Sequence, residues 1–178
     1  MSYKEERYFS IEEYKKIIAL QKDVHEVQIS EISPQDLVQL WSTTLENGMH
    51  GISFSAYEEG QKPGDIITED QVRRRMKIIA PYTKWVRSFS CTEGNEHIPV
   101  IAHEFGIKTL VGAWLGDNSE VNEREIEGLI KLSNEGFVDI AAVGNEVMFR
   151  KDMTEVELLD FIKRVKKVIP SSIPVGYV

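Results

Sequence analysis

The chain has 178 residues, which suits one domain of ordinary size with a sizeable core. Its net charge of -8 leaves no basic patch for a nucleic acid or an anionic membrane surface, and no stretch of 18 apolar residues could span a membrane. The single cysteine, Cys91, excludes an internal disulfide and a cysteine-based metal cluster.

Residues 1–48 predict a helical extension before the rest of the fold. The start, MSYKEERYFS, has no apolar signal region, so the protein is cytoplasmic if Met1 is native, and periplasmic or secreted if a signal peptide was removed. Helix starts are expected at Ser10-x-x-Glu13 and at Ser33-Pro34, with room for a short strand at 27–29.

From residue 50 onward, short apolar runs alternate with helical patterns. The runs are 50–55, 85–90, 108–115, 139–144 and 174–178. Their nearly continuous apolarity is typical of parallel strands that are covered on both faces. Capping motifs at Thr68-x-x-Gln71, Asn122-x-x-Glu125 and Thr154-x-x-Glu157 predict helix starts between them. This alternation predicts an α/β fold with a parallel sheet.

Five strands fit two architectures. A doubly wound sheet would be nearly complete, whereas a (β/α)8 barrel needs roughly 250 residues, so that residues 49–178 would form its N-terminal half. A doubly wound nucleotide-binding domain should have a glycine-rich turn after its first strand. The stretch YEEGQKPGD, residues 57–65, has neither G-x-G-x-x-G nor a P-loop and carries two acids. The sequence therefore argues against a nucleotide site.

Polar and aromatic residues gather where the predicted strands end, the edge at which both architectures place their sites. Tyr57 follows the first strand, Arg87 lies in the second, Trp114 lies at the end of the third, and Asn145 and Glu146 follow the fourth. An aromatic ring offers an apolar face to sugar C–H groups, while amides and arginines bind hydroxyls. A carboxyl group held protonated in a desolvated cleft can deliver its proton to a glycosidic oxygen. The set suits a sugar ligand.

The stretch AVGNEV, residues 142–147, resembles the fourth-strand motif of glycoside hydrolase family 17, the β-1,3-glucanase family. Three earlier stretches resemble the bacterial members of that family. They are GISFSAYEEGQ (51–61), WVRSFS (85–90) and HEFGIKTLVGAWLG (103–116), and VGNEVMFR (143–150) continues the fourth. The resemblance covers about residues 49–178 in order, and residues 1–48 are not part of it.

This resemblance implies a (β/α)8 barrel and retaining hydrolysis of β-1,3-linked glucan of the laminarin type. Glu146 stands where the family has its general acid/base, and Asn145 stands where the wider clan has an amide that binds the 2-hydroxyl. We expect Arg87, Trp114 and Tyr57 to contact the substrate, although an internal ion pair is an equal alternative for Arg87. The family's nucleophile comes from about the seventh strand, so no residue of this chain is assigned to that role. The chain alone should therefore not hydrolyse glucan, and no cofactor is expected.

A half barrel would leave its first and fifth strands with unpaired edges. The missing barrel half is therefore expected from the parent chain or from a partner. Two alternatives to a hydrolase stay open, a non-catalytic carbohydrate-binding barrel and a β-glucan transglycosylase that uses the same covalent intermediate.

Other reactive residues have ordinary interpretations. The four histidines have no partner at metal-ligand spacing, so no metal site is predicted. Cys91 has no obvious base nearby in the sequence and is expected to be a spare thiol. Met148 and Phe149 are expected to pack behind the site.

Overall fold

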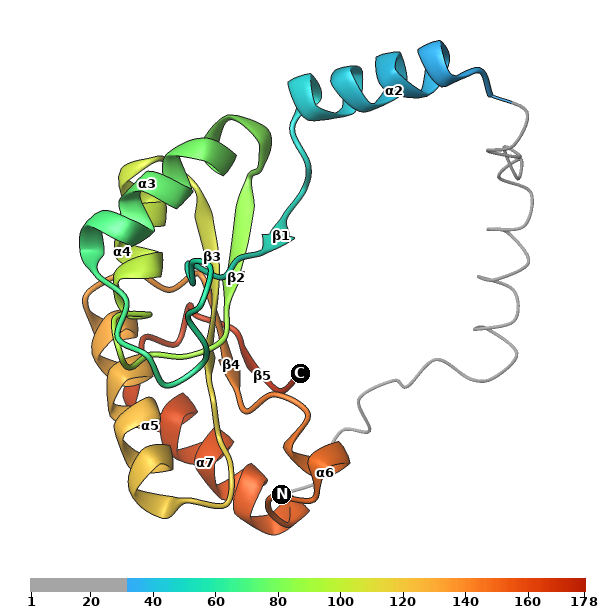
Figure 1. Ribbon diagram of the computed structural model, residues 1–178. Helices are drawn as coiled ribbons and strands as arrows, with labels where there is room; N and C mark the ends of the chain where they lie inside the picture. The colour runs from blue at the N-terminus through green and yellow to red at the C-terminus, as the bar shows by residue number, and fades with distance from the viewer. Residues whose placement is uncertain (1–31) are drawn as a thin grey trace, which may run out of the picture. The chain divides into compact units, whose positions relative to one another are not determined.

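The structure, a computed structural model, describes residues 32–178 (Figure 1). The chain divides into two compact units between residues 42 and 43. Helix α2 (Pro34–Asn47) begins as the Ser33-Pro34 motif predicts, because the Asp36 backbone N–H donates to Ser33 Oγ at 3.2 Å. The helix start predicted at Ser10 and the strand at 27–29 lie outside the described residues.

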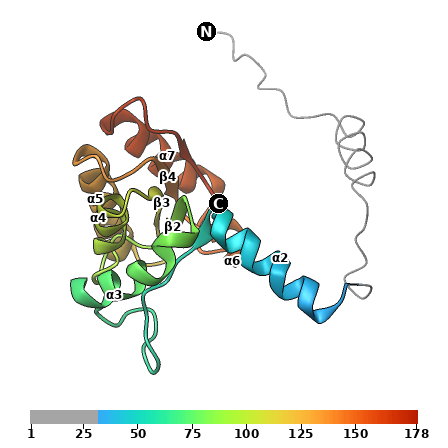
Figure 2. The same ribbon diagram turned by 90° about the horizontal axis from the view of Figure 1, so that it is seen from above.

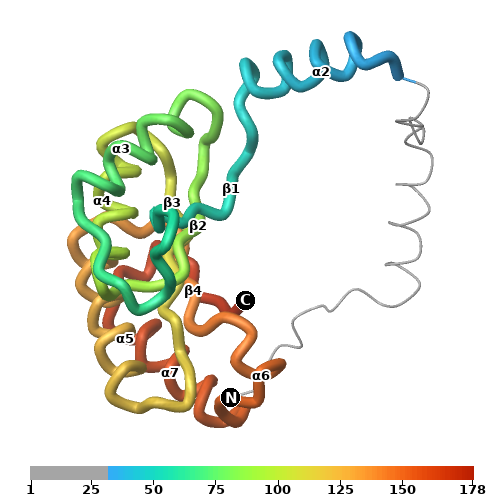
Figure 3. The backbone as a smooth tube through the Cα atoms, in the orientation of Figure 1, coloured from blue at the N-terminus to red at the C-terminus, as the bar shows by residue number. Residues whose placement is uncertain are grey.

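Five parallel strands form one sheet in chain order. They are β1 (Ile52–Ser53), β2 (Trp85–Ser88), β3 (Lys108–Ala113), β4 (Ile140–Val143) and β5 (Val175–Gly176). Each strand pairs in parallel with its neighbour in the chain. In Figure 3 the colour of the chain changes in the same order, from cyan near β1 to red at the C-terminus. A doubly wound sheet must reverse its strand order, and this one does not. The prediction of a barrel-type α/β fold is confirmed.

Helices connect the strands, and those of eight residues or more lie on the same side of the sheet (Figures 1 and 2). They are α3 (Glu69–Ile79), the 3-10 turn η2 (Ala80–Tyr82), α4 (His97–Glu104), α5 (Ser119–Asn134), the single turn α6 (Val147–Arg150) and α7 (Glu155–Val168). One-sided cover by α3, α4, α5 and α7 matches the outer ring of helices around a barrel. Within residues 32–178, none of these helices is long and apolar enough to cross a bilayer.

The core between helices and sheet has two parts. The first includes Val72 and Met76 of α3, Ile98 and Ile101 of α4, and Val86 of β2. The second includes Val111, Ile126, Leu129, Val143, Leu158 and Val165, from β3, β4, α5 and α7. These residues are almost fully buried, so their burial supplies the main force that holds the helices on the sheet.

The opposite face of the sheet carries apolar side chains that are only partly covered. Trp85, Leu110 and Ile140 line a hollow of about 310 Å³ there, together with Arg87. In a closed barrel, side chains of alternate strands fill this interior in layers. The hollow thus lies on the face of the sheet opposite to the helices.

Two predicted helix caps are found as expected. Thr68 Oγ1 accepts the Gln71 backbone N–H at the start of α3, and Thr154 and Glu157 form a complete capping box at the start of α7. In this box Glu157 Oε2 accepts both the backbone N–H and the hydroxyl of Thr154, which lowers the pKa of Glu157.

The start of α5 differs from the prediction. The helix begins at Ser119, and Asn118 caps it by accepting the N–H groups of Glu120 and Val121. The predicted cap, Asn122, is instead buried inside the helix. Its amide bonds both the N–H and the carbonyl of Gly116 at 2.8 Å. The motif at 122–125 therefore reflects two inward-facing polar residues rather than a helix start.

Candidate active site

The chain turns sharply where β4 ends. Gly144 has φ +84°, and its N–H still donates to Ala113 O at 3.1 Å, while Glu146 has φ 52°. The Glu146 N–H donates to Val178 O at 2.6 Å, which ties this turn to the chain beyond β5. A glutamate in the left-handed region is uncommon, and such backbone strain is concentrated at functional sites. The Glu146 side chain is exposed at the carboxyl edge of the sheet.

Asn145 is held from the neighbouring strands. Arg87 of β2 donates a short hydrogen bond from Nη2 to Asn145 Oδ1, and its guanidinium lies 4.7 Å from the centroid of the Phe89 ring. Arginine can only donate, so the amide oxygen faces Arg87 and the amide NH₂ is left to donate elsewhere. Within residues 32–178 Arg87 forms no ion pair, so its role as an internal ion-pair partner is not what the structure shows.

An aromatic pocket of about 440 Å³ opens at the ends of β1, β2 and β3. Its aromatic lining comes from Phe54, Tyr57, Phe89 and Trp114. Trp114 is 40 % exposed, and the Tyr57 hydroxyl accepts a hydrogen bond from Asn95 Nδ2 at 3.4 Å. The two predicted aromatic contacts thus share one pocket, which offers flat apolar surface beside polar groups.

Glu125 of α5 is a functional candidate that sequence reasoning missed. Its carboxylate is 2 % exposed and accepts four hydrogen bonds. The donors are the Ser90 and Thr92 hydroxyls at 2.5 and 2.7 Å and the Cys91 and Trp114 N–H groups at 2.8 and 3.0 Å. Glu125 thereby fixes the loop after β2 and the end of β3, both of which line the aromatic pocket. The signal for this buried position was an acid four residues before Leu129 and seven before Leu132, on the buried face of α5.

Arg150, the last residue of α6, is the second residue that was missed. It donates a short hydrogen bond from Nη1 to Asn145 O and another from Nη2 to Leu115 O at 2.7 Å. Its Nε pairs with Asp152 at 2.7 Å, and its guanidinium carbon lies 4.6 Å from the centroid of the Trp114 ring. Arg150 therefore links Trp114 at the end of β3 with Asn145 at the end of β4.

The residues between Glu146 and Arg150 correct one expectation. Met148 is 41 % exposed and Phe149 is 84 % exposed, so neither packs behind the site. The single turn of α6 buries only Val147, because so short a helix presents one residue to the core.

The predicted site residues form two groups that Arg150 connects. Arg87 contacts Asn145, while Trp114 and Tyr57 line the aromatic pocket. Glu146 adjoins Asn145 in the chain, but its side chain makes no hydrogen bond within residues 32–178.

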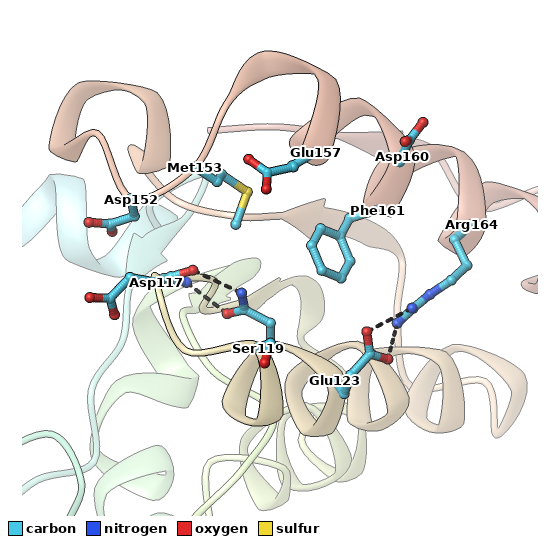
Figure 4. Close-up of a pocket in the computed structure, with 11 residues that line it drawn as sticks. Asp117, Ser119, Glu123, Asp152, Met153, Glu157, Asp160, Phe161 and Arg164 are labelled. Carbon is cyan, nitrogen blue, oxygen red and sulfur yellow. Dashed lines mark hydrogen bonds and ion pairs between the residues drawn. The ribbon is translucent and has the colours of Figure 1, made fainter.

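A second pocket, of about 400 Å³, lies between α5 and α7 (Figure 4). Met153 and Phe161 form its apolar lining, and acids surround them. Arg164 binds Glu123 with two hydrogen bonds of 2.9 and 2.7 Å, which lowers the pKa of Glu123 and raises that of Arg164. None of the predicted site residues lines this pocket, so the edge with the aromatic pocket is the candidate active site.

Comparison with known proteins gives two matches. The model of the BtgE/BtgC glycoside hydrolase domain matches residues 51–178. Among solved structures, the chain is similar to an active-site mutant of Rhizomucor miehei beta-1,3-glucanosyltransferase in complex with laminaritriose, with a TM-score of 0.60 and 25% sequence identity. That alignment covers 73% of this chain and 49% of the other, so this chain spans about half the length of the enzyme it resembles.

No curated protein matches the chain. The domain match nevertheless covers well over half of the chain, and it includes all five strands and every predicted site residue. The chain belongs to the BtgE/BtgC glycoside hydrolase family.

Proposed function

We propose that this chain is the acid/base half of a retaining, β-1,3-glucan-active enzyme of the glycoside hydrolase family 17 type, with Glu146 as general acid/base. The observation that carries the proposal is the arrangement at the end of β4. There Glu146, in a left-handed backbone conformation, follows an asparagine that Arg87 orients. Parallel α/β barrels carry their chemistry at this edge.

Asn145 is proposed to bind the sugar hydroxyl next to the reacting carbon. Because Arg87 occupies the amide oxygen, the Nδ2 group would be the donor to that hydroxyl. In glycosidases, substrate distortion and hydrogen bonds to the 2-hydroxyl that strengthen in the transition state together lower the barrier by several kcal/mol.

Trp114 and Tyr57 are proposed as sugar-stacking surfaces. Both line the aromatic pocket, whose flat rings suit the C–H faces of glucose units. The similar enzyme was solved with laminaritriose, a β-1,3-linked glucan oligosaccharide, which supports this class of ligand.

Retaining hydrolysis needs a second carboxyl group about 5–5.5 Å from the first to act as the nucleophile. We propose that it comes from the second half of the barrel, supplied by the parent chain or by a partner. Residues 49–178 would then be the first half of the barrel, and residues 1–48 a helical extension. The partly covered inner face and the double length of the similar enzyme support this division.

Transfer to a sugar acceptor is the second candidate function, because the similar enzyme is a beta-1,3-glucanosyltransferase. Both reactions share the covalent glycosyl-enzyme. Water resolves it in hydrolysis, and a sugar hydroxyl resolves it in transfer.

Incubation of the full-length protein with laminaritriose tests the proposal. Shorter products indicate hydrolysis, and longer products indicate transfer. The pure 178-residue chain is expected to form neither. Turnover by this chain alone would contradict the shared-site proposal, and binding without turnover by the full-length protein would favour a non-catalytic carbohydrate-binding barrel.

A further inference from the structure

We infer that Arg150 is a positioning residue for glucan binding, which joins the ends of β3 and β4 and presents Trp114 and Asn145 to the sugar. This role rests on the proposed function, because Trp114 and Asn145 are the proposed substrate contacts. Arg150 itself acts through these two residues.

Two backbone carbonyls at the strand ends accept hydrogen bonds from Arg150. The last paired residues of β3 and β4 are Ala113 and Val143, so the carbonyls of Leu115 and Asn145 lie beyond the ladder. Leu115 is completely buried, and a buried carbonyl needs a donor. Arg150 donates to both carbonyls from one rigid plane, which fixes the spacing of the two strand ends.

Trp114 is held at both its backbone and its ring. Its backbone N–H is held by Glu125 at 3.0 Å, and the Arg150 guanidinium lies against the ring at 4.6 Å. Backbone and ring are therefore both fixed. Since Trp114 also lines the aromatic pocket, stacking on one side of the indole leaves the other side for a sugar.

The contacts of residue 150 need the planar guanidinium of an arginine. Asp152 pairs with Nε, so the cation stays in place while the two terminal nitrogens reach the carbonyls. A lysine ammonium is a point charge that cannot make these contacts in one plane or stack flat on an indole. The Arg150→Lys change thus keeps the charge and removes the geometry.

Arg164 offers a matched control. It pairs with Glu123 through two hydrogen bonds, and its guanidinium carbon lies 5.2 Å from the centroid of the Phe161 ring. The chemistry is that of Arg150, but Arg164 contacts none of the proposed substrate residues. If substitution of either arginine weakens laminaritriose binding equally, the effect is structural. If only substitution of Arg150 weakens it, the effect reports the positioning of Trp114 and Asn145.

The experiment measures laminaritriose affinity by calorimetry in the full-length protein, with urea unfolding to compare stability. Arg150→Lys should weaken binding about 10- to 100-fold, the range for hydrogen bonds from a charged donor. Arg164→Lys should change affinity by less than about twofold, as expected for a substitution remote from the site. Asp152→Asn, a milder variant that keeps the shape, should weaken binding about two- to fivefold.

A double-mutant cycle tests the route through Trp114. In a Trp114→Ala background, Arg150→Lys should cost clearly less affinity than in the wild type, because the ring it orients is gone. Equal costs in both backgrounds, or equal affinities of Arg150→Lys and Arg164→Lys, would overturn the role of Arg150 alone. A wild-type protein that binds no laminaritriose would overturn the proposed function and the positioning role together.

Discussion

At the residue scale, the turn after β4 depends on Gly144. Its φ of +84° is in the left-handed region, and a Cβ there would lie 3.3 Å from Leu158 Cδ1 and 3.4 Å from Val147 Cγ1. Glycine is therefore favoured by the backbone conformation, while a Cβ would require only small shifts of these two side chains. This turn aims Asn145 and Glu146 away from the core, so that two polar side chains follow a buried strand without being buried with it.

Contacts between these residues were only partly predictable. Asn145 and Arg87 were predicted as site residues from their places after the fourth strand and within the second. Their mutual hydrogen bond depends on how β2 and β4 are placed across β3, which no local pattern encodes. Arg150 was missed because it binds backbone carbonyls, and any residue can provide a carbonyl.

Cys91 allows a test of burial at the residue scale. Loss of water on burial raises the pKa of the Cys91 thiol well above its usual value, and the charges of Glu125 and Glu96 add to the shift. The folded protein should therefore react with a disulfide reagent only as fast as it opens, while urea should expose a fully reactive thiol. Native labelling at the rate of a free thiol would contradict this burial.

The raised pKa of Cys91 also predicts how the free energy of unfolding changes with pH. A thiol whose pKa is higher in the folded than in the unfolded state stabilises the fold only while both states are protonated. The Cys91 contribution should be intact at neutral pH and should decline as the pH rises above the ordinary thiol pKa. A Cys91→Ala variant should lack this decline, and unfolding measured across alkaline pH would show the difference.

At the element scale, α5 shows where capping patterns mislead. All five predicted strands are found, each shorter than predicted by two to four residues, because buried apolar runs and parallel strands coincide. The helix start was misplaced because Asn122 and Glu125 match a capping box while serving tertiary contacts. Asn118, the actual cap, has no acid or amide three residues later.

Two substitutions separate these roles. Asn118→Ala should lower the free energy of unfolding by about 1 kcal/mol, the usual cost of a lost N-cap. Asn122→Ala should cost more, about 2 kcal/mol or above, because it removes the buried Asn122 amide and leaves the partly buried N–H and carbonyl of Gly116 without these partners. Urea unfolding of both variants checks the order, and an equal or reversed order would contradict the tertiary role of Asn122.

At the scale of the whole molecule, only one face of the sheet is covered by helices. Helices cover the outer face, while Trp85, Leu110 and Ile140 line a hollow on the inner face. The alternation of strands and helices predicted the fold class. It could not show that the strand order lacks a reversal, because strand order is set by packing between distant segments.

The inner face tests the proposed second half of the barrel. Leu110→Ala in the full-length protein should cost about 2–5 kcal/mol, the range for truncating a buried leucine. In the 178-residue chain Leu110 is only partly buried, so the cost should be clearly smaller. Denaturant unfolding of the four proteins makes the comparison. Equal costs would show that nothing further covers this face.

The most direct test of the account is the rate of glucan cleavage or transfer by the full-length protein carrying Glu146→Gln. The amide keeps the shape of the side chain but cannot deliver a proton. The value of kcat/KM on laminarin-type glucan should fall about 10²- to 10⁴-fold. Glu59→Gln, at an exposed acid of the same sheet edge, should stay within about twofold of the wild type. A Glu146→Gln variant with nearly full rate would contradict the assignment of Glu146 as the general acid/base.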